Sequence, residues 1–167
     1  MLRPENIFIM QNDMSVGRWL PALSLMSWAR NGLSLISGVR LGHCPPLELE
    51  TIIEGPTLDF TLLHPGSVPL VSPKLAEILK IHCSSFLELL LWRVPKGDVV
   101  SFSLVNVMCV SDCTVIGDPA LGPTLTSGEI PEASIFRAKT GIVCCTNHIA
   151  NILKSERITG IQFLQLS

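Results

Sequence analysis

The chain has 167 residues, of which 47 % are hydrophobic and 16 % are charged, and its formal net charge is -2. A chain of this length fits one domain with a single core. Its charged fraction is below the roughly 25 % of an average soluble domain, so either the core is large or some apolar surface is kept for a partner. No run of Lys and Arg is present, which argues against a groove for nucleic acid.

The apolar segments are too short to cross a membrane. Glu88, Arg93 and Asn106 interrupt the longest of them before the roughly 20 residues that a span needs. The first residues hold one Arg and then a four-residue apolar run, too short for the core of a secretory signal. We therefore expect a cytoplasmic protein, in which thiols stay reduced. The six cysteines are Cys44, Cys83, Cys109, Cys113, Cys144 and Cys145.

Residues 1–55 give the weakest structural signals. The segment 7–10 predicts a short strand, whereas the apolar stretch 19–28 has no clear period. Residues 33–41 favour a strand interrupted by a glycine. A cluster of Gly and Pro then predicts a loop that leads into the apolar segment 47–53.

From residue 58 onward the signals agree with one another. The segment 58–63 predicts a strand, and His64-Pro65-Gly66 predicts a turn. Ser72 suits the N-cap of a helix. Pro73 suits its first position, because an N–H there has no acceptor within the helix and proline therefore loses nothing by lacking one. An apolar stripe then predicts a short surface helix on a sheet, through Leu75, Ile78 and Leu79.

Two β-rich segments, 86–94 and 99–110, flank Pro95-Lys96-Gly97-Asp98 and predict an antiparallel hairpin. Pairing Val94 with Val99 predicts a core face made of Leu87, Leu89, Leu91, Phe102 and Leu104. The outward face then carries Glu88, Trp92, Ser101 and Ser103. Asn106 falls on the core face, where an unsatisfied amide would cost about 1–3 kcal/mol.

The segment Gly117 to Pro131 holds six Gly or Pro residues and predicts a loop of about fifteen residues. A loop of this length is either a binding surface or an idle excursion.

The last part of the chain, residues 134–166, predicts a strand, a helix and a strand. An apolar run ends at Thr146, a helix follows, and Gly160 opens the final strand. The start of this helix matches the start after Ser72: a hydroxyl cap, an aliphatic residue at the third place, then Ala and Ile-Leu-Lys. Together the segments predict one α+β domain, 1–167, with a mixed, mostly antiparallel sheet and two or three short helices packed on it.

Two chemical interpretations of the cysteines remain open. Cys109 and Cys113 with Cys144 and Cys145 could be zinc ligands, but they lack two matching C-x₂₋₄-C pairs, so buried reduced thiols are the favoured explanation. A thiol nucleophile would be Cys83, Cys144 or Cys145, activated by His82 or His148. Cys145 also lies just before a predicted helix, and a helix N-terminus lowers the pKa of a thiol. No orienting partner can be named. No phosphate-binding glycine motif or zinc-protease motif is present.

Phe136-Arg137 and the tryptophans each allow a structural and a binding interpretation. A lone Arg at a strand start is either ion-paired structure or an interface anchor, because Arg is enriched in binding hot spots. Trp19, Trp28 and Trp92 pose the same choice. Trp92, on the outward face of the predicted hairpin, is the one we expect to meet a partner.

Four short motifs follow one another in a recognisable order. They are Val71-Ser72-Pro73-Lys74-Leu75 before a helix, Leu104-Val105-Asn106-Val107 followed by Asp112, Ile135-Phe136-Arg137, and Thr159-Gly160-Ile161-Gln162-Phe163. In this order the chain resembles immunity family 11 of bacterial polymorphic-toxin systems, over about residues 58 to 166.

The resemblance implies a small bacterial protein that binds one cognate secreted toxin and neutralises it by occluding or distorting the toxin's active site. Such a protein needs no catalytic residue, metal or cofactor, and it binds neither nucleic acid nor membrane. The family-pattern positions, expected to be structural, are Asn106, Asp112, Phe136, Gly160 and Phe163. The candidate toxin contacts are Trp92, Ser101, Ser103, Asp118, Glu129, Glu132 and Arg137.

Two other functions stay open beside an immunity protein. One is a small Cys/His-dependent hydrolase. The other is a structural subunit whose excess apolar surface pairs with itself, and a homodimer is open for the immunity protein as well.

Overall fold

The computed structural model describes residues 2–96, 98–118 and 122–167, without the side chains at 95–99 and 118. The described residues contain twelve strands and three α-helices. The helices are α1 (Leu25–Ile36), α2 (Pro73–Cys83) and α3 (Asn147–Ser155), with a 3-10 turn at Pro4–Asn6. The strands are β1 (Ile7–Asn12), β2 (Leu20–Leu23), β3 (Leu49–Ile53), β4 (Phe60–Leu63), β5 (Val68–Val71), β6 (Leu87–Lys96), β7 (Asp98–Val107), β8 (Thr114–Asp118), β9 (Gly122–Ser127), β10 (Ile135–Arg137), β11 (Val143–Thr146) and β12 (Ile161–Gln165).

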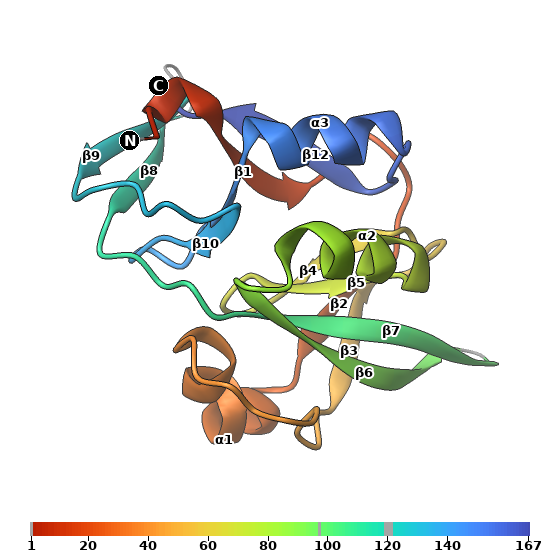
Figure 1. Cartoon of the computed structure of the whole chain (residues 1–167). Coiled ribbons are helices and arrows are strands. Elements are labelled where there is room, and N and C mark those ends of the chain that lie inside the picture. The colour runs from red at the N-terminus through yellow and green to blue at the C-terminus, as the bar shows by residue number, and fades with distance from the viewer. Residues whose placement is uncertain (1, 97, 119–121) are drawn as a thin grey trace.

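The strands form two four-stranded antiparallel sheets, in the orders β10-β11-β1-β12 and β4-β5-β7-β6, and two two-stranded sheets, β2-β3 and β8-β9. Figure 1 shows the first large sheet with α3 in the upper half of the view and the second in the lower half, with α2 above it and α1 below it. The expected α+β architecture is confirmed, although the strands divide among four sheets and do not form one.

Period-two alternation decides which side of each large sheet a residue covers. In β1, Met10 and Phe8 pack with the central cluster between the two sheets, whereas Ile7 and Ile9 pack with the outer cluster beneath β8 and β9. The adjacent Cys144 and Cys145 of β11 divide in the same way, since successive strand residues point to opposite faces. The central cluster also takes the buried faces of α2 and α3.

The second large sheet is likewise covered on both faces. Val105 and Val107 of β7 pack in the central cluster, and Phe102 and Leu104 pack in a lower cluster with α1 and β2. A sheet buried on both faces has apolar residues at consecutive positions. This explains the four consecutive apolar residues of β6, from position 89 to position 92.

The hairpin of β6 and β7 is confirmed, but the predicted register is wrong by one residue. Val94 pairs with Val100 and not with Val99, so even-numbered residues face even-numbered ones. Glu88 and Trp92 therefore share a face with Leu90, Phe102, Leu104 and Asn106. Leu87, Leu89 and Leu91 share the opposite face with Ser101 and Ser103. Gly97 of the predicted turn lies outside the described residues.

Two further predictions need correction. The segment 117–131 is not one loop, because its first part forms the hairpin of β8 and β9, with the glycine at 122 in a left-handed conformation (φ 80°); residues 119–121 lie outside the description. The segment 33–41 is not a strand, because its first four residues end α1.

The predicted helix starts are confirmed, with one difference in their caps. Ser72 accepts a hydrogen bond from the backbone N–H of Leu75 at 3.2 Å, as an N-cap should. Thr146 occupies the equivalent position before α3, yet its side chain makes no cap hydrogen bond. The strand-helix-strand order of residues 134–166 is confirmed by β11, α3 and β12.

Within the described residues, no helix is both long and apolar enough to span a bilayer.

Candidate partner-binding surface

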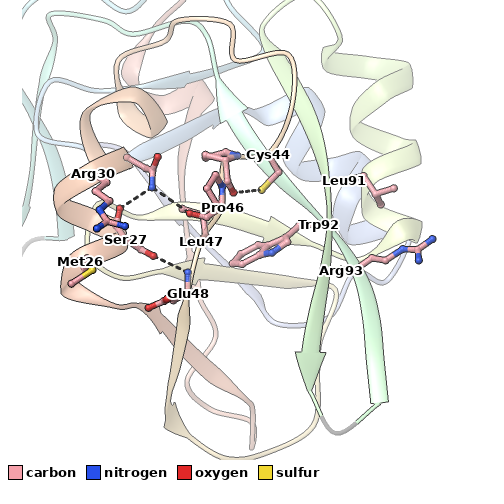
Figure 2. Close-up of a pocket in the computed structure, with 12 residues that line it drawn as sticks. Met26, Ser27, Arg30, Cys44, Pro46, Leu47, Glu48, Leu91, Trp92 and Arg93 are labelled. Atoms are coloured by element: carbon pink, nitrogen blue, oxygen red, sulfur yellow. Dashed lines mark hydrogen bonds between the residues drawn. The ribbon is translucent and has the colours of Figure 1, made fainter.

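A cleft of about 470 Å³ lies between α1, the segment 44–48 and strand β6, and we call it the α1–β6 cleft. Figure 2 shows the Trp92 ring pointing from β6 toward the segment 44–48, while Leu91 and Arg93 point to the other side of the strand. The residues lining the cleft are Met26, Ser27, Arg30, Asn31, Cys44, Pro45, Pro46, Leu47, Glu48, Leu91, Trp92 and Arg93.

The segment 44–48 is held against α1 by hydrogen bonds between its backbone and polar side chains of the helix. Ser27 Oγ accepts a hydrogen bond from the Glu48 N–H at 2.7 Å, and the Asn31 amide donates to the carbonyl of Pro46 at 3.4 Å. Ser24 caps the helix by accepting from the Ser27 N–H at 3.2 Å. Hydrogen bonds within the chain therefore fix the wall of the cleft opposite Trp92 in the unbound protein.

The loop that follows α1 is held on the sheet by a buried carboxylate at the start of β6. Glu88 accepts hydrogen bonds from the N–H groups of Leu41 and Gly42, both at 2.8 Å, and from the side-chain amide of Asn106 at 2.9 Å. Burial would raise the pKa of Glu88, but these three hydrogen bonds and the charge of Arg40 lower it overall. The carboxylate is thus held in its charged form and fixes the loop against the sheet.

Asn106 is fully buried, as its predicted place on a core face requires, although the register that placed it there was wrong. Its amide nitrogen donates to the Val39 carbonyl at 2.7 Å as well as to Glu88. This family-pattern residue therefore has a structural role, since it joins β7, β6 and the loop before the cleft.

A second hollow of about 470 Å³ lies on the opposite face of β6, between the strand and α2, and we call it the α2–β6 hollow. Leu87 and Leu89 of β6 and Ser103 of β7 line it, because odd-numbered residues point to this side. Charged groups on its rim are Arg40, Glu77, Lys80 and Glu88.

The outer face of α1 continues the cleft as an exposed apolar surface. Leu25 and Leu33 are 84 % and 83 % exposed, and Met26 lies between them on the same side of the helix. Leu91 of β6 is 67 % exposed on the other side of the strand. Large apolar side chains gathered beside a cleft are typical of a protein-binding surface.

Three of the predicted partner contacts lie on or beside β6. Trp92 lines the α1–β6 cleft, Ser103 lines the α2–β6 hollow, and Ser101 is exposed next to them, paired with Arg93. Trp92 does not point outward as predicted: it is half-buried and packs against the lower cluster.

Acidic candidates gather elsewhere, in a shallow hollow formed by residues 110–112 and 129–132, here called the acidic hollow. It brings together Asp112, Glu129 and Glu132, three residues that the sequence singled out separately. The side chain of Asp118 lies outside the described residues. Among the described residues, no group of three His, Cys, Asp or Glu side chains could hold a metal ion.

Arg137 is 2 % exposed, so in this structure it cannot contact a partner. Its guanidinium donates to the carbonyls of Gly66 and Gly141, both at 2.7 Å, and to that of Ser67 at 3.2 Å. Burial lowers the pKa of Arg137 to about 10, which still leaves it charged at neutral pH. The residue joins β10 to the β4–β5 turn.

Three further family-pattern residues, Phe136, Gly160 and Phe163, have structural roles, whereas Asp112 is exposed in the acidic hollow. Phe136 is fully buried in the outer cluster. Gly160 has a left-handed φ of 84°, and a Cβ there would lie 2.6 Å from the Phe60 carbonyl, so only glycine fits. Phe163 meets the ring of Phe8 edge-on at 6.4 Å.

The candidate thiols lie in surroundings that oppose nucleophilic chemistry. Burial raises the pKa of Cys144 to about 12 and raises that of Cys145 well above its ordinary value. Burial also raises the pKa of Cys83. Cys145 lies just before α3, yet its thiol points into the central cluster, where burial outweighs any effect of the helix N-terminus on its pKa.

Sequence reasoning missed α1 and the segment 44–48, which supply most of the cleft. The signal was present as a buried stripe at helical spacing, made of Trp28, Gly32, Leu35 and Ile36. The glycine at position 32 interrupts the apolar pattern, so the helix was not predicted. The structure requires this glycine, because a Cβ at Gly32 would lie 2.6 Å from the Trp28 ring.

No protein-family model matches the chain, and no curated protein is significantly similar to it.

Proposed function

We propose that this chain is a non-enzymatic, cytoplasmic immunity protein, which binds one cognate bacterial toxin and neutralises it by covering the toxin's active site. The observation that carries the proposal is the α1–β6 cleft with its exposed apolar rim. The order of short motifs that resembles immunity family 11 gives the partner its identity.

The cleft supports protein binding because it combines the features of an interface centre. Trp92 supplies an aromatic wall, Met26 and Leu47 supply apolar contacts, and Arg30 is exposed at the rim. Aromatic residues, Met and Arg are enriched in protein interfaces. The walls are fixed by hydrogen bonds within the chain, so little ordering free energy is lost on binding.

The thiol-hydrolase alternative has less support. A nucleophilic thiol must reach its thiolate form near neutral pH, whereas burial raises the pKa of all three candidate thiols. The self-pairing alternative uses the same apolar surface as the immunity proposal. A monomer in dilute solution would count against self-pairing.

The test is co-expression with the product of the adjacent open reading frame. If that frame encodes a polymorphic toxin, its C-terminal domain should stop the growth of a bacterial host, and this chain should restore growth and form a stable complex with the domain. A metabolic enzyme at that position, or a toxin domain that neither binds nor is neutralised, would overturn the proposal.

A matched pair of exposed apolar residues maps the surface. Met26 is 59 % exposed in the cleft and Ile116 is 51 % exposed on β8. We expect Met26→Lys to weaken the complex at least about tenfold and Ile116→Lys to leave it unchanged, since an unpaired charge is costly only where it is buried. The reverse result would move the interface to the β8–β9 side.

A further inference from the structure

Strand β6 forms one edge of the second large sheet, β4-β5-β7-β6, here called the lower sheet. The direction in which its backbone N–H and C=O groups point follows from one hydrogen bond. The Met108 N–H donates to the Phe86 carbonyl at 2.9 Å, so this pair is a hydrogen-bonded one. Hydrogen-bonded and open pairs alternate along an antiparallel ladder. Even-numbered residues of β6 therefore bond to β7, and Leu89, Leu91 and Arg93 direct their N–H and C=O groups to the open edge.

Within the part of the chain that the structure describes, the outward groups of these three residues have no hydrogen-bond partner. The open stretch has defined ends. On one side the loop at Leu41 and Gly42 is bound to Glu88. The other end is Pro95, which has no backbone N–H. Proline is tolerated there because odd-numbered residues of β6 donate no hydrogen bond to β7.

We propose that the partner adds an extended segment to this edge, pairing its backbone with Leu89, Leu91 and Arg93. This inference rests on the proposed function, because the toxin supplies the added strand. Side chains of an added strand alternate between the two faces of the sheet. One set would enter the α1–β6 cleft beside Trp92, and the other would lie over Leu91 and the α2–β6 hollow.

The two faces select different side chains. The cleft offers Trp92, Met26 and Leu47, which suit apolar side chains. The opposite face carries three exposed cations, Arg93 on β6 with Lys80 and Arg40 at the rim of the hollow, against one exposed carboxylate, Glu77. Glu88 is buried and already binds three N–H groups of the chain. The added segment should therefore alternate apolar and acidic residues.

A second copy of this chain fits the edge less well. Two β6 strands paired through their odd positions would place Leu89, Leu91 and Arg93 of one copy against the same residues of the other. Each copy would bring three exposed cations to this face, Arg40, Lys80 and Arg93, against one exposed carboxylate, Glu77. Leu90 and Val94 are 3 % and 1 % exposed within their own core, so they cannot fill the cleft of another copy.

The direct test is amide hydrogen exchange of the full chain, alone and bound to the C-terminal toxin domain encoded by the adjacent gene. Binding should slow exchange at Leu89, Leu91 and Arg93 at least about tenfold. Leu90 and Trp92 serve as internal controls, because β7 already protects their N–H groups. Complex formation without added protection at the three odd positions would overturn strand addition while leaving the immunity function in place.

Two variants at one position separate backbone from side chain. Leu91→Pro removes the outward N–H and should weaken binding at least about tenfold, whereas Leu91→Ala keeps the N–H and should cost less than about threefold. Equal effects would overturn the proposal. So would protection of the same amides in the free chain together with a dimeric mass, which would assign the edge to a second copy. A toxin domain that does not bind the wild-type chain would reject the proposed function and the strand addition together.

Discussion

The two edges of the lower sheet are treated in opposite ways. At the β4 edge, the Phe60 N–H donates to the Thr159 carbonyl at 3.1 Å and the Leu62 N–H donates to Asn12 Oδ1 at 2.8 Å. The carbonyl of His64 accepts from the Leu23 N–H at 2.7 Å. At the β6 edge the outward groups of Leu89, Leu91 and Arg93 have no such partners among the described residues.

The open edge is therefore a local feature of β6 and not a general property of the sheet. Open edges invite aggregation, and proteins usually cover or charge them. Here the chain itself covers the β4 edge. The β6 edge is open only between Glu88 and Pro95, and this open stretch carries the charge of Arg93. An edge restricted to three donors suits one partner strand.

Arg18→Met should produce the largest effect, because it removes the cover of the closed edge. Arg18 is 3 % exposed and donates to the carbonyls of Phe60 and Gly160 and to Thr61 Oγ1, at 2.6 to 2.7 Å. Leaving such buried acceptors unsatisfied costs about 1–3 kcal/mol each, so we expect the free energy of unfolding to fall by about 3 kcal/mol in urea denaturation.

The matched control for this change is Arg93→Met at the open edge. Arg93 is exposed, and we expect its loss to change the free energy of unfolding by less than about 0.5 kcal/mol. Equal destabilisation by the two substitutions would contradict the distinction between the closed and the open edge.

Trp92→Ala should weaken toxin binding by about 2 kcal/mol, as expected for an aromatic residue at an interface centre. Because Trp92 also packs against the lower cluster, the variant should be less stable than the wild type. Binding by isothermal calorimetry and unfolding by urea measure the two effects separately. Trp92→Phe, which keeps an aromatic wall, should recover most of both; unchanged affinity of the Ala variant would remove the cleft from the interface.

Glu88→Gln should lower the free energy of unfolding by about 1–2 kcal/mol at neutral pH, because hydrogen bonds to a charged group are stronger than neutral ones. The pKa of Glu88 lies below its ordinary value of 4.5 in the folded chain. Its stabilisation is therefore complete above pH 4.5 and is lost as the pH falls through the lowered folded pKa. The difference between wild type and variant should shrink over that range.

Glu48→Gln is the control for this pH dependence. Glu48 lines the α1–β6 cleft and is exposed, so at neutral pH the substitution should change the free energy of unfolding by less than about 0.5 kcal/mol. If wild type and Glu88→Gln differed by the same amount at pH 7 and pH 3, the carboxylate would not be the group that fixes the loop.

Local signals in the sequence were enough for the elements that stand alone. The cap at Ser72, the helix that follows it and the strand-helix-strand order of residues 134–166 depend on neighbouring residues, and all were predicted. The α+β class followed from them. The interfaces between elements did not, because they depend on contacts between distant segments.

The register of the β6–β7 hairpin shows the physical reason. Residues 87–92 are apolar at five of six positions, and α2 and α1 bury opposite faces of the strand. Alternation then gives no preference between two registers that differ by one residue. The candidate site suffered accordingly: Trp92 was identified, but its neighbours in the cleft come from α1 and from 44–48, which carried no strand or helix signal strong enough to predict.

The smallest predicted effect compares the two helix starts, one of which lies at the closed edge. Ser72 Oγ accepts from the Leu75 N–H and donates to Asp59 Oδ1 at 2.7 Å, just before β4 begins, whereas Thr146 makes no cap hydrogen bond. Ser72→Ala should therefore lower the free energy of unfolding by about 1 kcal/mol, and Thr146→Ala by no more than a few tenths. Thermal or urea denaturation of both variants measures the difference, and a larger loss for Thr146→Ala would mean that α3 depends on a contact of that hydroxyl outside its own first turn.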